Sequence, residues 1–144
     1  MASVGRLLET ALYVDDVERA AEFYQRVLGL GPTLTTTTEN TGQKRLFAPL
    51  HMPGGQVLLL FAKGSTNTAV LLGGTIPPHD GSGRLHLAFA ISAAELDAWR
   101  ERLQSQGVPI EGEMTWPRGG TSLYFRDPDD HLVELATPGL WSTY

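Results

Sequence analysis

Three ionisable side chains have the types and the surroundings to do chemistry: Glu9 in ETALYV, His86 in HLAFAI and Glu134 in LVELA. Glu134 lies between Val133 and Leu135, and a buried carboxylate without a partner is costly, so water, an arginine or a metal ion must satisfy it. A histidine and two carboxylates suit a divalent metal ion with five or six ligands, and they leave positions open for substrate oxygens. The three residues therefore predict a metal site.

The residues around this trio indicate that it faces a cavity. The stretches alternate with a period of two, which is typical of strands. Side chains two apart share a face of a strand, so His86 lies beside Ala88 and Ala90, and Glu134 lies beside Ala136. The opposite faces carry large apolar residues that suit packing under a helix. We therefore expect the ionisable groups to point away from the helices, into a surface lined by small side chains.

Each of the three residues also has a simpler interpretation when it is taken alone. A single histidine in a strand, such as His86, is more often a core or surface residue than a ligand, and Glu9 alone reads as a solvated strand residue. Glu134 alone would pair with Arg126 or Arg45. The joint placement, with two of the three at equivalent positions of an internal repeat, favours the metal site.

The elements that must position these residues follow one order twice: a strand, a helix and three strands. In the first half we expect strands at 6–14, 33–38, 44–50 and 56–62, with a helix that Asp15 or Asp16 caps and Gly29 ends. In the second half we expect strands at 85–91, 108–114, 122–126 and 132–136. Its helix begins with a capping box of Ser92 and Glu95 and ends at Gly107.

The two halves also match residue by residue. ETALYVDD from Glu9 aligns with HLAFAISA from His86, and GQVLLLFA aligns with DHLVELAT, which places Leu59 where Glu134 stands. Such an internal duplication is a strong signal of fold. It predicts an α+β class and one domain over 1–144, with a first βαβββ module at 5–62, a glycine- and proline-rich linker at 63–84 and a second module at 85–137.

The composition excludes several classes of function. The 144 residues carry a net charge of −5, so there is no electrostatic reason to expect nucleic acid or an acidic membrane surface as a partner. The sequence contains no cysteine, which excludes disulfides, thiolate catalysis and cysteine-rich zinc sites. No apolar run reaches transmembrane length and the N-terminus lacks the pattern of a signal peptide, so we expect a cytoplasmic protein.

The opening LYVDDVERAAEFYQRVLGL, the ending SLYFRDPDDHLVEL and the repeated order of elements resemble the vicinal oxygen chelate superfamily. This group includes glyoxalase I, fosfomycin-resistance thiol transferases, bleomycin-binding proteins and extradiol dioxygenases. The resemblance covers nearly the whole chain. It implies a curved, mixed, eight-stranded open barrel-like sheet around a pocket, with the helices outside, and a homodimer. It also implies that metal ligands come from the first and last strand of each module, at Glu9, Leu59, His86 and Glu134.

Three positions depart from the family pattern. The first ligand is commonly histidine and here is Glu9, which makes the site more anionic and favours Mn²⁺ or Fe²⁺, with Zn²⁺ and Ni²⁺ as alternatives. Leu59 stands where glyoxalase I has a ligand or a catalytic base. Leucine neither coordinates a metal nor moves a proton, which argues against glyoxalase I and epimerase chemistry. Asp130 replaces the glycine that is usual in the DPDGH turn.

Other residues are candidates for substrate binding. Arg118 would clamp an anionic substrate and Trp116 would form an apolar wall, with a solvated arginine and a packed tryptophan as the alternative. Tyr124 would donate to a substrate oxygen, although packing is the commoner role for such a tyrosine. The remaining candidates are Tyr13, Arg45 and Leu59. Of the other histidines, His79 is expected to be solvated and His131 to be structural.

Together these features predict a divalent-metal-dependent enzyme that chelates neighbouring oxygens of a small molecule, with the metal as Lewis acid. No residue is a convincing general base, so a ligand carboxylate, for which we take Glu134, or a metal-bound water would serve. One alternative is a metal-free protein that sequesters a small molecule or antibiotic in the manner of the bleomycin-binding proteins. Another, which rests on Leu59, is a structural or regulatory dimer whose site has decayed.

Overall fold

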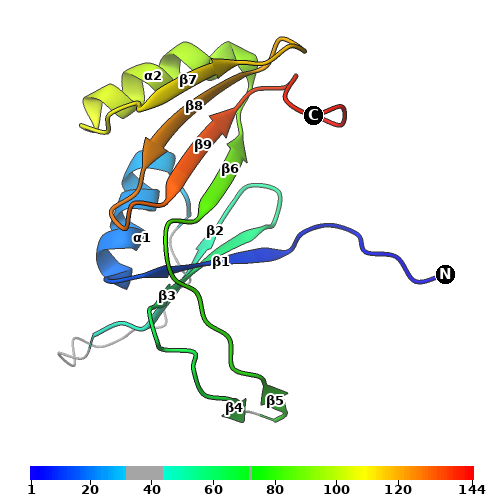
Figure 1. Cartoon of the computed structure of the whole chain (residues 1–144), viewed down its shortest axis with the longest axis vertical. Coiled ribbons are helices and arrows are strands. Elements are labelled where there is room, and N and C mark those ends of the chain that lie inside the picture. Colours follow the sequence, from blue (N-terminus) through cyan, green and yellow to red (C-terminus); the bar gives the residue numbers. More distant parts are fainter. Residues whose placement is uncertain (32–43, 72) are drawn as a thin grey trace. The chain divides into compact units, whose positions relative to one another are not determined.

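The computed structural model describes residues 1–31, 44–71 and 73–144. The chain divides into two compact units, Met1–Ser82 and Gly83–Tyr144 (Figure 1). Each unit combines a helix of ten or more residues with a β-sheet, so the α+β class is confirmed. The predicted strand at 33–38 lies outside the described residues. The eight-stranded open barrel and the module boundaries stay predictions.

The first unit places one helix against a three-stranded sheet. In this sheet β3 (Val57–Ala62) lies between β1 (Glu9–Val14), to which it is parallel, and β2 (Phe47–His51), to which it is antiparallel (Figure 1). The helix α1 (Val17–Leu28) begins where predicted, because the Asp16 carboxylate accepts from the Arg19 amide at 3.1 Å, and Gly29 caps its end.

The alternation of each strand in the first unit decides which residues form the core. One face of the sheet packs against α1, and its side chains are fully buried or nearly so. Burial of this apolar surface is the main favourable term that holds the helix to the sheet. The core residues are Leu12, Val14, Val17, Ala20, Ala21, Tyr24, Val27, Ala48, Leu50, Leu58, Leu60 and Ala62.

The second unit has the same parallel pairing of its first and last strands. Its sheet has the order β6 (His86–Ala90), β9 (Leu132–Ala136), β8 (Thr121–Arg126) and β7 (Gly112–Thr115), with β6 parallel to β9 and the other pairs antiparallel. The helix α2 (Leu96–Ser105) follows the short 3-10 turn η1 (Ala93–Glu95) (Figure 1). Its core includes Leu103, Leu123, Phe125, Val133 and Leu135.

Two local predictions for the second unit are wrong. The predicted capping box does not form, because the Ser92 hydroxyl donates to the Glu95 carboxylate at 2.7 Å and makes no bond to the helix backbone. The strand predicted from Val108 begins only at Gly112. The Val108 amide instead donates to the Leu103 carbonyl at 2.9 Å, and Pro109 has no amide hydrogen for a strand ladder.

The strand register confirms the internal duplication. Ala11 pairs with Leu59 in the first unit, and Ala88 pairs with Glu134 in the second. Leu59 therefore occupies the place in its sheet that Glu134 occupies in the other, as the alignment of the halves predicts. A separate hairpin of β4 (Val70–Leu71) and β5 (Thr75–Ile76) lies in the predicted linker.

The tight turn before β9 contains an aspartate in a conformation that favours glycine. Asp130 has a φ of 68°. Its Oδ2 lies 2.7 Å from Arg84 Nε, and both side chains are exposed. Exposed ion pairs contribute little to stability. The left-handed backbone, by contrast, costs about 1 kcal/mol when the residue has a Cβ.

We therefore expect Asp130→Ala to be about 1 kcal/mol less stable than Asp130→Gly. Both variants lose the carboxylate, so their difference isolates the cost of the Cβ at this φ. Urea unfolding of the two variants, followed by circular dichroism, measures it. Equal midpoints would show that the turn relaxes to accept the side chain.

Candidate functional site

Two of the predicted ligands meet in the second unit. His86 Nε2 lies 3.2 Å from Glu134 Oε2, because β6 and β9 are parallel neighbours and both side chains project from the same face of the sheet. The Glu134 side chain is 6% exposed and the His86 side chain is 50% exposed. The pair is therefore a buried carboxylate with an accessible imidazole beside it, on the face that also carries Ala88 and Ala90.

The backbone determines which nitrogen of His86 carries hydrogen. Nδ1 lies 3.1 Å from the Leu132 carbonyl oxygen, which only accepts, so Nδ1 donates. The lone pair of Nε2 in the neutral ring then points at a carboxylate oxygen of Glu134. A nitrogen lone pair and a carboxylate oxygen repel each other, so this arrangement is favourable only when a proton or a metal ion lies between them. A backbone carbonyl that fixes the ring in this way is the usual support of a metal-binding histidine.

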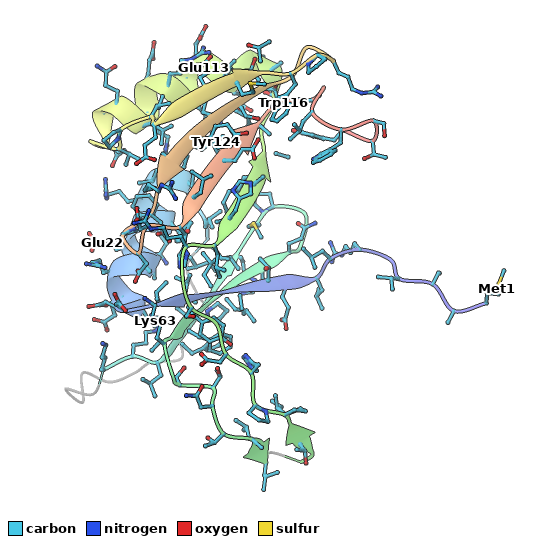
Figure 2. The ribbon with its side chains drawn as sticks, in the orientation of Figure 1. Met1, Glu22, Lys63, Glu113, Trp116 and Tyr124 are labelled. Carbon is cyan, nitrogen blue, oxygen red and sulfur yellow. The ribbon has the colours of Figure 1, made fainter. Side chains whose placement is uncertain are left out.

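The other oxygen of Glu134 is held by protein donors. Glu134 Oε1 accepts from the Ser122 hydroxyl and, at 3.2 Å, from the Tyr124 hydroxyl. The Trp116 indole donates to Ser122 Oγ at 2.8 Å. Figure 2 labels Tyr124 on β8 and Trp116 at the turn that leads into it. One carboxylate oxygen is thus occupied by hydrogen bonds, which leaves Oε2 for His86 or for a bound cation.

Tyr124 is kept in its donor form by its surroundings. Burial raises the pKa of the Tyr124 phenol above its usual value, and the neighbouring Glu134 carboxylate raises it further. The phenol therefore keeps its proton throughout the physiological range and donates to Glu134. The role of Tyr124 as a donor to a substrate oxygen stays a prediction.

The third predicted ligand, Glu9, belongs to the first unit. It is exposed at the start of β1 and lines a pocket there. Within residues 1–31, 44–71 and 73–144, no group of three or more histidine, aspartate and glutamate side chains is arranged to hold a metal ion. The structure thus brings together His86 and Glu134, and the role of Glu9 stays a prediction.

The other residues that were predicted to bind substrate or to pair with Glu134 differ in their contacts. Trp116 supports Ser122, whereas Arg118 is exposed. Arg45 Nε donates to the Phe47 carbonyl at 2.9 Å. Arg126, considered as a partner of Glu134, pairs with Glu111 at 3.0 Å.

His131 has the structural position that was expected. It is fully buried in the turn before β9, and its Nδ1 accepts from the Leu85 amide at 3.0 Å. Its own amide donates to Asp127 Oδ1 at 2.9 Å. These bonds join the turn to the residue before β6, so His131 helps to keep β6 and β9 in register.

The first unit contains a pocket with a volume of about 470 Å³ on the sheet face opposite α1. Its walls are mainly apolar and come from β1, β2, β3 and the connection that follows β3. Leu59, one of the predicted substrate contacts, is among them. Tyr13 lies next to the pocket: its ring stacks on Phe61, and its hydroxyl bonds to His79 and Thr66. His79 is exposed, as expected, although its ring also bonds to Tyr13.

Both units pair the first strand of their main sheet parallel to its last strand, and the second unit adds the His86–Glu134 pair. A comparison with family models identifies the class of protein to which these features belong. The model of the Glyoxalase/Bleomycin resistance protein/Dioxygenase superfamily matches residues 6–135, and the chain belongs to that superfamily. The resemblance inferred from the sequence is confirmed.

Particular relatives are known from structure and from sequence. The crystal structure of lactoylglutathione lyase from Agrobacterium tumefaciens is 32% identical, with a TM-score of 0.82 over 98% of this chain and 99% of that chain. A probable lactoylglutathione lyase of Vibrio cholerae is 26% identical over 90% of this chain and 88% of its own length. Fosfomycin resistance protein FosX of Listeria innocua is 47% identical over 51 residues, 35% of this chain and 38% of that protein.

These relatives fit the prediction of a glyoxalase-like protein. A further match, 43% identical over 36% of this chain and 37% of its own length, is to the metallothiol transferase FosB of Shouchella clausii. These two matches, to FosX and to FosB, span little more than a third of those proteins. Among the helices in the described parts of the chain, none is long and apolar enough to cross a membrane.

Proposed function

We propose that the protein is a divalent-metal-dependent enzyme that binds a small oxygen-rich molecule through neighbouring oxygens. His86, Glu134 and Glu9 are the metal ligands, and the ion is Mn²⁺, Fe²⁺, Zn²⁺ or Ni²⁺. The observation that carries the proposal is the orientation of His86, whose donated Nδ1 hydrogen leaves Nε2 facing Glu134 Oε2 at 3.2 Å. The protein acts as a cytoplasmic homodimer with an eight-stranded open barrel-like sheet.

The separation of the two ligand atoms supports a metal ion. Two atoms that would each bind one ion at about 2.1 Å lie about 3.0 Å apart at an octahedral angle and about 3.4 Å apart at a tetrahedral angle, and the observed 3.2 Å falls between these values. The half-exposed imidazole leaves room for substrate at the same ion. When bound, the metal supplies Lewis acidity to the substrate oxygens.

The remaining catalytic and substrate-binding roles belong to residues of the protein. Glu134 is the catalytic carboxylate, and the bonds from Ser122 and Tyr124 hold it in one rotamer. Leu59 supplies no second base, which argues against the proton transfers of a lactoylglutathione lyase. The relatives named for fosfomycin resistance and thiol transfer are therefore the better guide to the reaction class. Arg118 and Arg45 are proposed to bind an anionic part of the substrate.

The test is elemental analysis of untagged protein, followed by activity assays. We expect about one divalent metal ion per chain. The loaded protein, given fosfomycin with and without glutathione, is then examined by phosphorus NMR for a new product. Product that requires metal would support the proposed reaction class. A protein that takes up none of the four metals after incubation with each would refute the proposal.

A second candidate function is favoured by the pocket of the first unit. A volume of about 470 Å³ with mainly apolar walls is suited to holding a ligand without any reaction. A metal-free protein that sequesters a small molecule or antibiotic would use such a pocket. Ligand binding by a protein that takes up no metal would make this the better account.

Support of Glu134 by Ser122 leads to a prediction about metal affinity. Ser122→Ala removes the hydroxyl that donates to Glu134 Oε1 and accepts from Trp116, so the carboxylate gains rotamers. We expect the metal to bind about 10- to 100-fold more weakly. Competition with a chelator of known affinity measures the change, and Ser105→Ala, at the exposed end of α2, is the control. Equal affinities in the two variants would show that Ser122 has no part in orienting Glu134.

A further inference from the structure

Hydrogen bonds link Trp116 to Glu134 through one buried hydroxyl group. The Trp116 indole donates to Ser122 Oγ at 2.8 Å, and the Ser122 hydroxyl donates to Glu134 Oε1. An indole nitrogen only donates and a hydroxyl has one hydrogen, so both hydrogens are directed toward the carboxylate. Trp116 thus occupies an acceptor position of Ser122 Oγ and leaves the hydroxyl hydrogen for Glu134.

The burial of these groups makes the bond from the indole consequential. Ser122 and Glu134 are 0% and 4% exposed, whereas Trp116 is half-buried. Without the indole, Ser122 Oγ would lose a hydrogen bond in a buried place, which costs free energy unless the hydroxyl turns to a new arrangement. Successive hydrogen bonds also strengthen one another, so the indole makes the Ser122 hydroxyl a better donor to the carboxylate.

The backbone of Trp116 is held in the turn between β7 and β8. The Trp116 amide donates to the Gly120 carbonyl at 2.8 Å, and the Gly119 amide donates to the Trp116 carbonyl at 2.8 Å. Ser122 lies on β8, two residues after Gly120, and Figure 2 labels Trp116 at this end of the strand. The turn and the strand together therefore fix where the indole meets the hydroxyl.

The segment that follows β9 packs against the same turn (Figure 1). The Thr121 amide donates to Thr137 Oγ1 at 2.8 Å, and the Thr137 amide donates to the Thr121 carbonyl at 3.0 Å. A Cβ on Gly120 would lie 2.6 Å from the Gly139 carbonyl carbon, so the two backbones are in contact. The turn that carries Trp116 is therefore fixed to the end of the strand that carries Glu134.

We propose that Trp116 is a positioning residue, which holds the Ser122 hydroxyl toward Glu134 and so keeps the carboxylate in the orientation that binds a metal ion. This inference rests on the proposed function, because Glu134 is a metal ligand in that proposal. It gives Trp116 a role other than that of a wall for substrate. Partners that orient a ligating carboxylate typically change the metal affinity about 10- to 100-fold when they are removed.

A double-mutant cycle on Zn²⁺ affinity, measured by competition with a chelator, tests the role of Trp116. We expect Trp116→Phe, which keeps an aromatic ring and lacks the N–H, to bind Zn²⁺ about tenfold more weakly than the native protein. Added to Ser122→Ala, the same substitution should change the affinity less than about twofold, because the hydroxyl that the indole holds is gone. A tenfold loss in both backgrounds would overturn the inference and make Trp116 a packing residue.

The control is Trp141→Phe, which changes an exposed tryptophan of the same unit and should leave the affinity for Zn²⁺ as it is. Equal affinities of Trp116→Phe and Trp141→Phe would also overturn the inference.

Proton NMR of the metal-free protein tests the same bonds without the ion. In Glu134→Gln the neutral amide oxygen is a weaker acceptor, so we expect the Trp116 indole proton to move upfield while that of Trp141 stays in place. In a Ser122→Ala background, Glu134→Gln should leave the Trp116 signal unchanged. A Trp116 signal that ignores Glu134→Gln when Ser122 is present would refute the positioning role. Absence of metal uptake together with the expected NMR shift would refute the proposed function alone.

Discussion

Glu134→Gln and His86→Ala are each expected to abolish stoichiometric metal binding. In the native protein Nε2 and Oε2 face each other at 3.2 Å, and both would ligate the ion. In Glu134→Gln the side-chain amide keeps an oxygen that accepts from Ser122 and Tyr124. This variant therefore removes the negative charge with little loss of packing. Its amide hydrogens would face the Nε2 lone pair, an arrangement that is satisfied without metal. Elemental analysis of each untagged variant after exposure to the metal measures the loss.

Thermal unfolding separates a ligand role from a packing role. A metal ion at 100 times its dissociation constant stabilises the native protein by about 2.7 kcal/mol, which corresponds to a rise in Tm of roughly 8 °C for a chain of this size. The native protein should show this rise, and the two variants should not. Without metal, we expect Glu134→Gln to unfold within about 2 °C of the native protein.

The matched control is Glu101→Gln on the exposed side of α2, which removes one carboxylate of the same unit and should leave metal binding unchanged. Retention of metal by both site variants would contradict the assignment of the ligands. Equal destabilisation of metal-free and metal-treated His86→Ala would mark His86 as a packing residue.

Gly139→Ala is expected to lower the free energy of unfolding by about 3 kcal/mol, a large value for one methyl group. A Cβ at Gly139 would lie 2.5 Å from the Gly120 amide nitrogen and 2.9 Å from the Arg118 carbonyl oxygen. Both neighbours are backbone atoms, so no side chain can rotate away. The φ of 103° adds strain for any residue with a Cβ. The displaced segment is the turn that carries Trp116, so the support of Ser122 would also be affected.

Gly119→Ala is the control for the backbone conformation alone. Its φ of 92° is similar, but a Cβ there would meet no atom within 4 Å. We expect a loss of about 1 kcal/mol, so the difference of about 2 kcal/mol measures the backbone clash. Urea unfolding at constant pH gives both values. Equal losses would show that the C-terminal segment moves away from Gly120 without cost.

The faces of the strands could be derived from the sequence because side-chain direction alternates strictly along a strand. That rule placed His86 and Glu134 on one face together with the alanines, and the strand pairing of β6 with β9 agrees with this. The internal repeat added the register, since matching strands in two copies must pair alike. Strand ends were less accurate, as at Val108, where a bond to the end of a helix competes with the ladder.

The hydrogen-bond partners at the site could not be derived in the same way. Trp116 was interpreted either as a wall for substrate or as a packed residue, and neither interpretation included the bond that its indole donates to Ser122. The bond from Tyr13 to His79 joins residues that are 66 positions apart, through a connection with no periodic pattern. A pattern of glycine and proline predicts that such a segment leaves the sheet, but it carries no information about where the segment lies.

The sequence by itself determined the family, the class of fold and the pair of ionisable residues in neighbouring strands. These follow from periodicity and duplication, which act over a few residues or repeat along the chain. Only the tertiary structure decided that the Leu132 carbonyl orients His86, that Ser122 and Tyr124 occupy one oxygen of Glu134, and that an aromatic pocket lies beside Glu9. Such contacts depend on strand register and on long connections, because side chains distant in sequence meet only when the backbone has been placed.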